Sequence, residues 1–178
     1  MARFTSARNE APSFLQQVAG VLGLGGNSDS PKTNDDLDAW LKATLEEAFG
    51  ITDIQRDEDG DIPIRYGSAV VFIRRSDPES PFLEIFAPLL EGFTITPDVY
   101  EAVNALNRQV PMAKATVDAD NKEIILSADV LIAHTLSPDN LMFAVELVAD
   151  TADHFDTMLQ KRFGGRTMLD DDDDSFDV

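Results

Sequence analysis

The chain has 178 residues, of which 43% are hydrophobic, so it is long enough to bury the core of one domain. Its formal net charge is -19, and residues 35–169 alone carry 25 acidic and 11 basic side chains. This charge argues against binding to nucleic acid or anionic lipid, since both are negative. The absence of cysteine excludes disulfides, thiol nucleophiles and thiolate metal sites.

The first 33 residues (1–33) are predicted to form a flexible extension with one short amphipathic helix. Ser13 suits a helix N-cap and Gly23 suits a helix end. Between them, apolar side chains recur at helical spacing, at Phe14, Leu15, Val18, Val21 and Leu22. Residues 25–31 are typical of a linker. The helix could pack on its own domain, act as a regulatory cover, bind a partner, or stay disordered.

No membrane span is predicted, because no run of 18 apolar residues exists. Arg3 and Arg8, ahead of the apolar stretch 14–24, imitate a signal peptide. Gln16 and Gln17 interrupt that stretch, however, and no small-residue cleavage site follows it. We therefore expect a cytoplasmic protein that does not bind membranes.

A folded domain is predicted over residues 34–165. Its first helix starts near Asn34 and ends at Gly50, with one apolar stripe at Leu37, Trp40, Leu41, Leu45, Ala48 and Phe49. After a charged turn, Ile62, Ile64 and Tyr66 alternate with polar residues and Pro63. This pattern predicts an edge strand, where a proline is tolerated.

Two further antiparallel strands are predicted between Ala69 and Leu90, joined by a Ser-Asp-Pro-Glu-Ser turn. Alternation places Val70 and Phe72 on one face and Val71 and Ile73 on the other. In the second strand the two opposed sets are Leu83, Ile85 and Leu89 against Phe82, Phe86 and Leu90. Both faces therefore need a cover, and three helices are expected to cover only one of them.

The second half of the chain repeats strong helix starts. Thr96-Pro97-Asp98 begins a helix that Pro111 ends, and Ser137-Pro138-Asp139 begins the longest helix, which ends at Gly164. Strands over 113–117 and 122–126 flank a four-residue loop and predict a hairpin. Residues 166–178, with six aspartates, are predicted to be a disordered acidic tail. The fold class is α+β: helix, three-stranded antiparallel meander, helix, β-hairpin, long helix.

Four short motifs accompany this order. They are Gly67-Ser68 before an apolar strand, Ala102 to Asn107 in the second helix, Ala113-Lys114-Ala115 at the hairpin, and Ala152-Asp153 with Phe155 in the last helix. Together they resemble the YbjN-like family, whose fold is similar to that of type III secretion chaperones. The likeness covers roughly Asn34 to Phe163. It implies a domain that binds an extended or helical segment of another protein, without catalysis or cofactor.

Neither catalysis nor a metal site is predicted from the residues themselves. No nucleophile has a base beside it in the sequence, and His134 has no evident partner. The stripe Glu146, Asp150, Asp153 and His154 could hold a divalent metal only if a second helix supplied ligands. A solvated helix face explains this stripe more simply.

Our first hypothesis is a non-catalytic, chaperone-like module whose apolar sheet face and adjoining helices hold a segment of another protein. The candidate partner-binding residues are Val70, Phe72, Ile73, Phe82, Ile85 and Phe86. The alternative is a structural homodimer with no client, in which this face pairs with its own copy. The acidic tail is expected to aid solubility, or to dock on a basic partner with Phe176 as an anchor.

Overall fold

The computed structural model describes residues 34–75, 77, 79–132 and 136–169. Three helices and five strands lie in these ranges, and their order confirms the predicted α+β fold. They are α2 (Asn34–Phe49), β1 (Ile62–Tyr66), β2 (Ala69–Arg74), β3 (Phe82–Glu91), α3 (Pro97–Gln109), β4 (Lys114–Asp118), β5 (Glu123–Leu131) and α4 (Pro138–Phe163). The amphipathic helix predicted after Ser13, His134 and most of the acidic tail lie outside the described residues.

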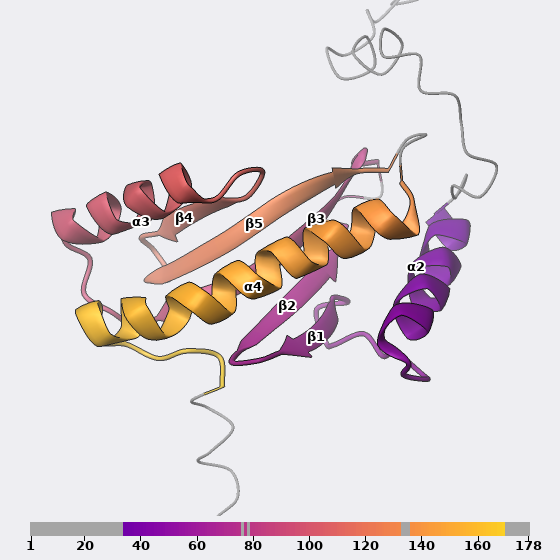
Figure 1. The fold of residues 1–178 in the computed structure, drawn as a ribbon, viewed down its shortest axis with the longest axis horizontal. Helices are drawn as coiled ribbons and strands as arrows, with labels where there is room; N and C mark the ends of the chain where they lie inside the picture. Colours follow the sequence, from indigo (N-terminus) through magenta and orange to yellow (C-terminus); the bar gives the residue numbers. More distant parts are fainter. Residues whose placement is uncertain (1–33, 76, 78, 133–135, 170–178) are drawn as a thin grey trace, which may run out of the picture.

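The five strands form one antiparallel sheet in the order β1-β2-β3-β5-β4 (Figure 1). β1 is an edge strand, as Pro63 predicts. β5 runs to Leu131, five residues beyond the predicted end of this strand, and pairs with β3 along its length. The prediction stopped early because Ser127 and Asp129 interrupt the apolar run, yet both occupy positions that alternate with buried residues.

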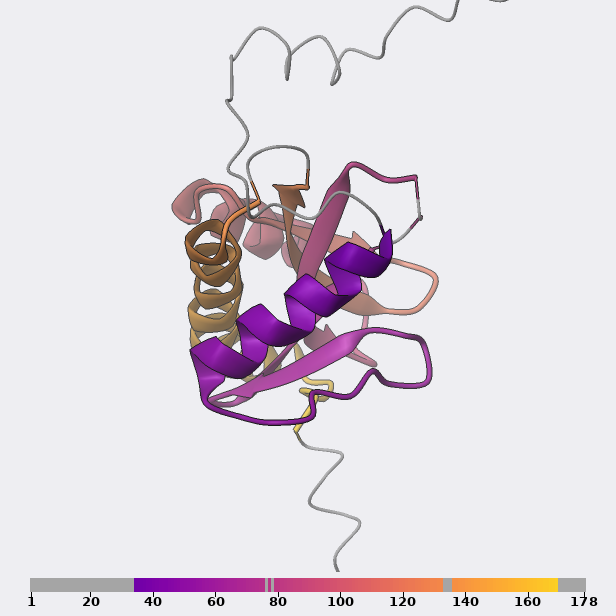
Figure 2. The same cartoon turned by 90° about the vertical axis from the view of Figure 1, so that its right-hand side faces the viewer.

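α4 crosses one face of the sheet, which we call the inner face (Figures 1 and 2). Its buried side chains, such as Leu141, Val148 and Ala152, share one core cluster with the side chains of the sheet. From the strands this cluster takes Ile62, Ile64, Ala69, Val71, Ile73, Leu83, Ile85, Ala87, Leu89, Leu90, Ala115, Ile124, Leu126 and Ala128. Leu37, Leu41 and Leu45 of α2 and Val99, Val103 and Leu106 of α3 also belong to it, as do Phe93 and Leu136 of the connecting segments.

A β-bulge changes the sheet face to which the last side chains of β3 point. The register with β5 shifts between Pro88 and Leu90, so that one extra residue, Leu89, is inserted. Leu89 and Leu90 are therefore both fully buried in the core cluster. The prediction that Leu90 shares a face with Phe82 and Phe86 is wrong, because strict alternation ends at the bulge.

The folded part of the chain continues past Gly165. Arg166 and Glu91 exchange two backbone hydrogen bonds of 2.9 Å, which form an isolated bridge at the end of β3. Gly165 has φ of +88°, and a Cβ there would lie 2.4 Å from the carbonyl oxygen of Glu91. A glycine is therefore required for this close approach, and Arg166 belongs to the domain rather than to the tail.

The turn between β1 and β2 is fastened to α4. The Asp153 carboxylate accepts hydrogen bonds from the backbone N–H of Ser68 at 2.6 Å and from its hydroxyl at 2.7 Å. The Ser68 hydroxyl also lies 2.7 Å from the buried carboxyl group of Asp156. Gly67 sits at φ of +57°, and a Cβ there would lie 2.3 Å from Asp153 Oδ1. Two of the motifs that carry the family resemblance, Gly67-Ser68 and Ala152-Asp153, thus meet in space.

The other edge strand, β4, is fastened to α3 in a comparable way. The Asn107 side chain donates to the carbonyl oxygen of Ala115 at 3.0 Å and accepts from its N–H at 2.6 Å. One side-chain amide therefore satisfies both backbone groups of an edge residue, as a neighbouring strand would. The remaining two motifs, Ala102 to Asn107 and Ala113 to Ala115, meet through this contact.

We expect Gly67→Ala to lower the free energy of unfolding by more than Gly92→Ala does. Gly92 has a similar φ of +66° with nothing within 4 Å of an added Cβ, so its substitution carries only the left-handed backbone cost of about 1–2 kcal/mol. Gly67→Ala adds displacement of the Asp153 carboxylate. Urea unfolding of both variants at neutral pH measures the difference, and equal losses would contradict the contact.

We expect Asn107→Ala to lower the free energy of unfolding by about 1–3 kcal/mol relative to Asn104→Ala, because two hydrogen bonds are lost. Asn104 is an exposed residue of the same helix, so the change in helix propensity is matched. Thermal or urea unfolding provides the measurement. A difference near zero would show that water replaces the amide without cost.

The hydrogen bonds from the Ser68 N–H and hydroxyl lower the pKa of Asp153 below its ordinary value. Because the unfolded chain has the ordinary pKa of about 3.9, this contribution to stability is complete above that value and is lost as pH falls through the folded pKa. We expect Asp153→Asn to weaken the pH dependence of stability below about pH 4. Unfolding curves of both proteins between neutral and acid pH measure it, and parallel pH profiles would contradict the assignment.

Candidate functional site

The sheet face turned away from α4, which we call the outer face, carries side chains in regular cross-strand rows. One row crosses all five strands and has the two aromatic residues at its centre. In strand order it consists of Pro63, Phe72, Phe86, Ser127 and Lys114. Phe72 and Phe86 are stacked, with ring centroids 5.2 Å apart and planes 19° apart. Neither residue belongs to the core cluster on the inner face.

The next row continues the apolar surface on one side of this stack. Arg65 is opposite Val70 in one strand pair, and Pro88 and Ile125 are opposite each other in another. Val70 is 7% exposed, whereas Ile125 and Pro88 are half-buried. The apolar band is therefore narrow, about two rows wide, and it is less extensive than the sequence predicts, where Glu84 is the only polar residue expected among the apolar ones of the third strand.

A charged row borders the stack on the other side. Arg74 donates to Glu84 at 2.9 Å, and its guanidinium group lies 4.3 Å from the centroid of the Phe86 ring. Arg74 also lies 4.0 Å from Asp61. Burial raises the pKa of Asp61, and the nearby Arg74 opposes that shift. Arg74 thus joins the charged row to the aromatic stack, and Phe86 is only 8% exposed.

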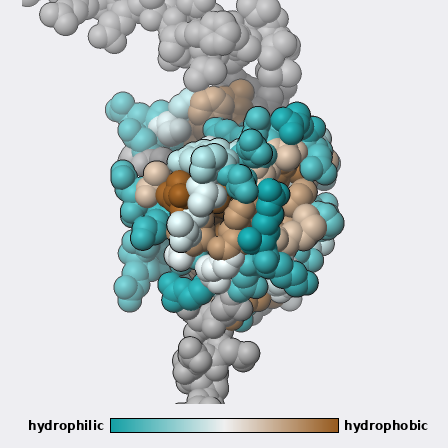
Figure 3. Space-filling model, turned by 90° about the vertical axis from the view of Figure 1, so that its left-hand side faces the viewer, coloured by the Kyte–Doolittle hydropathy of each residue, from teal (hydrophilic) through white to brown (hydrophobic). Residues whose placement is uncertain are grey.

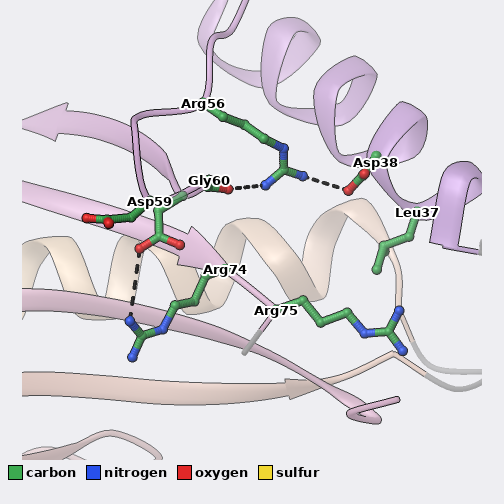
Figure 4. Close-up of a pocket in the computed structure, with 8 residues that line it drawn as sticks. Leu37, Asp38, Arg56, Asp59, Gly60, Arg74 and Arg75 are labelled. Atoms are coloured by element: carbon green, nitrogen blue, oxygen red, sulfur yellow. Dashed lines mark hydrogen bonds and ion pairs between the residues drawn. The ribbon is translucent and has the colours of Figure 1, made fainter. Parts of the chain in front are cut away.

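A polar hollow lies at the Arg74 end of the outer face, where α2 and the segment before β1 border it (Figure 4). Arg56 bridges Asp38 of α2, at 2.6 Å, and the carbonyl oxygen of Gly60 (Figure 4). Arg75 donates to the carbonyl oxygen of Ser80. Both guanidinium groups already have oxygen partners, Arg56 a carboxylate and Arg75 a backbone carbonyl, so we do not assign an anion site to the hollow.

The structure separates the six predicted partner-binding residues into two groups. Val70, Phe72, Phe82 and Phe86 lie on the outer face, whereas Ile73 and Ile85 point to the inner face and have no exposed surface. Including Ile73 and Ile85 in a partner-binding surface is therefore wrong while the helices stay packed. Their assignment failed because alternation defines two faces without saying which one the helices occupy.

Phe82 is not continuous with the aromatic stack. It faces Leu131 on β5, and the row of Glu84, Arg74 and Asp129 lies between it and Phe86. The sequence analysis missed Arg74, Glu84 and Ile125 as members of the outer face. A signal existed, because Glu84, the one charged residue inside β3 before its last position, marks the face that is not covered by helices.

The remaining apolar surface is distributed over the helices. A groove between α3 and α4 is lined by Ala102, Ala105, Leu106, Gln109, Phe155, Met158, Leu159 and Arg162. Figure 3 shows the end of the molecule to which α3 and the last turns of α4 belong, where apolar surface is interrupted by hydrophilic side chains. This surface is therefore not continuous.

The hypothesis of a metal site on α4 receives no support from the geometry. Asp153 is engaged by Ser68, and the His154 ring contacts the edge of Phe155. Within the described ranges, no group of three or more histidine, aspartate or glutamate side chains could hold a metal ion. Among the helices described, none combines the length and the apolar composition needed to cross a membrane.

Comparison with solved structures finds chains of similar fold, among them the following two. The ExsC–ExsE complex matches with a TM-score of 0.58 and 16% identity, covering 72% of this chain and 97% of that chain. YbjN from E. coli matches with a TM-score of 0.53 and 11% identity, covering 70% of this chain and 92% of that chain. At these identities the matches establish the fold alone. Among curated proteins, no sequence matches this chain.

A protein-family model gives the stronger result, because it matches residues 35–171, which include every described helix and strand except for the first residue of α2. The model is TY-Chap1, described as "T3SS (YopN, CesT) and YbjN peptide-binding chaperone 1". This confirms the resemblance found in the sequence and identifies a non-catalytic class of protein. The chain therefore belongs to the TY-Chap1 family of peptide-binding chaperones.

Proposed function

We propose that this protein holds an apolar segment of another protein on its outer sheet face, over Phe72 and Phe86. The observation that carries the proposal is the aromatic stack on the face opposite α4. Such a pair presents a flat apolar platform, and fully burying one large apolar side chain contributes about 1.5–3 kcal/mol. A peptide-binding family provides the class of function, and the stack provides a place for the peptide.

Charge around the stack supports a particular chemistry for the partner segment. Residues 35–169 carry 14 more acidic than basic side chains, so a segment with basic residues beside its apolar ones is attracted to the domain. Arg74 covers Phe86 in the free protein. Rotation of this side chain, which is 40% exposed, uncovers the second ring for the partner without any backbone change.

Phe72→Asp tests this proposal, because it places a charge at the centre of the platform. We expect affinity for the apolar peptides selected by the wild-type protein from a displayed random library to fall roughly 30-fold or more, equivalent to about 2 kcal/mol. Thr116→Asp is the matched control, since Thr116 is an exposed residue two strands beyond β3 on the same sheet. Fluorescence anisotropy of one selected peptide measures both variants.

Two outcomes would contradict the proposal. Equal peptide binding by a folded Phe72→Asp variant would place the peptide elsewhere on the domain. Light scattering that shows a dimer disrupted by Phe72→Asp would instead assign the outer face to a second copy of the chain, which is the structural homodimer considered from the sequence.

A further inference from the structure

A further apolar surface lies between β5 and the first turns of α4, apart from the aromatic stack and from the groove between α3 and α4. This groove is lined by Met112, Ala128, Asp129, Val130, Leu131, Asn140, Phe143, Ala144 and Leu147. β4 pairs with β5 only as far as Ser127, so the later residues of β5 border the groove instead of that strand. We refer to it below as the β5–α4 groove.

The β5–α4 groove is bordered by two strongly exposed hydrophobic side chains. Met112 is 78% exposed and Phe143 is 54% exposed, the largest values among the big hydrophobic side chains in the described part of the chain. Along α4 the lining residues fall at positions i, i+3, i+4 and i+7, which is one helical face. Apolar surface of this kind on a soluble domain indicates a docking site.

We infer that the β5–α4 groove is the docking site of the chain's own N-terminal segment, residues 14–22. Phe14, Leu15, Val18, Val21 and Leu22 recur with the same helical periodicity as the lining residues of α4. At a rise of 1.5 Å per residue, a helix over these residues extends about 12 Å, and the lining face from Asn140 to Leu147 extends about 10.5 Å. The two apolar stripes therefore match in length.

The connection between the segment and the domain favours this occupant over a separate molecule. Eleven residues, 23–33, join the segment to the start of α2, and a flexible chain of that length spans roughly 20 Å on average. The first turns of α2 and of α4 lie at the same end of the molecule in Figure 1, and Figure 2, which faces that end, shows them on opposite sides of it. Tethering at this range gives an effective concentration on the order of millimolar, which a free peptide rarely reaches.

Charge favours the same assignment. Residues 1–34 have three basic and two acidic side chains, whereas residues 35–169 carry a net charge of -14. Arg3 and Arg8 precede the apolar stripe. On the groove, Asp129 is paired with Lys114 at 3.4 Å, and Asp139 and Glu146 are exposed on the same turns of α4. Docking thus brings a basic segment to an acidic rim. A partner segment that uses the groove must first displace residues 14–22.

A spin label tests the contact in the full-length protein. The chain has no cysteine, so Gln17→Cys provides a single labelling position between the apolar residues of the segment. We expect the nitroxide to remove most of the amide NMR intensity of Val130, Phe143 and Leu147, and to leave that of β1 unchanged. Adding Phe143→Asp or Val18→Asp should restore the groove intensities. Met158→Asp, an exposed residue of the other groove on α4, should not.

Several results would overturn the inference. Groove amides that keep their intensity in the labelled chain would show that residues 14–22 do not dock there, and so would broadening that survives Val18→Asp. Broadening that appears only when isotope-labelled chain is mixed with spin-labelled chain would assign the groove to a second copy. Phe72→Asp should leave the contact intact, so failure of the peptide platform and failure of this docking are separate outcomes.

Discussion

The structure depends on a division between the two faces of one antiparallel sheet. α4, with stripes from α2 and α3, buries Val71, Ile73, Leu83 and Ile85 completely. Within the described part of the chain, no comparable layer joins the outer-face residues to that core. The outer face is stabilised instead by contacts within the sheet, namely the Phe72–Phe86 stack and the Arg74–Glu84 pair. These contacts need no covering helix, and this face is where we propose that a partner binds.

Both ends of the sheet are held by side chains from helices. Asp153 of α4 binds the turn that joins β1 to β2, and Asn107 of α3 binds the edge of β4. Edge strands are the parts of a sheet most prone to fraying and to pairing with other chains. These two contacts hold them in place through hydrogen bonds rather than through apolar packing. The residues that carry the family resemblance are the ones that make these contacts, which gives the resemblance a physical basis in the fold.

The two apolar surfaces suggest different occupants because their surroundings differ. The aromatic stack lies in a flat sheet face beside a row of paired charges, which suits an extended or helical segment from another protein. The β5–α4 groove is a narrow, helix-length surface near the start of the folded domain, which suits a segment tethered there. If both proposals hold, residues 14–22 of the chain compete with any partner segment for the β5–α4 groove, and the aromatic stack is not affected by this competition.

The sequence alone determined the number, order and type of the described elements, because helix starts such as Ser137-Pro138-Asp139 and ends such as Gly164 are local signals. It also placed Pro63 in an edge strand and associated the chain with its family. The sequence analysis did not predict the length of β5 or the bulge at Leu89, since both depend on pairing with a distant strand. The sequence analysis also did not distinguish Ile73 and Ile85 from Phe72 and Phe86, although the single charge of Glu84 was one indication of the uncovered face. Only the tertiary structure decided which face α4 covers, because alternation with a period of two is identical for either choice.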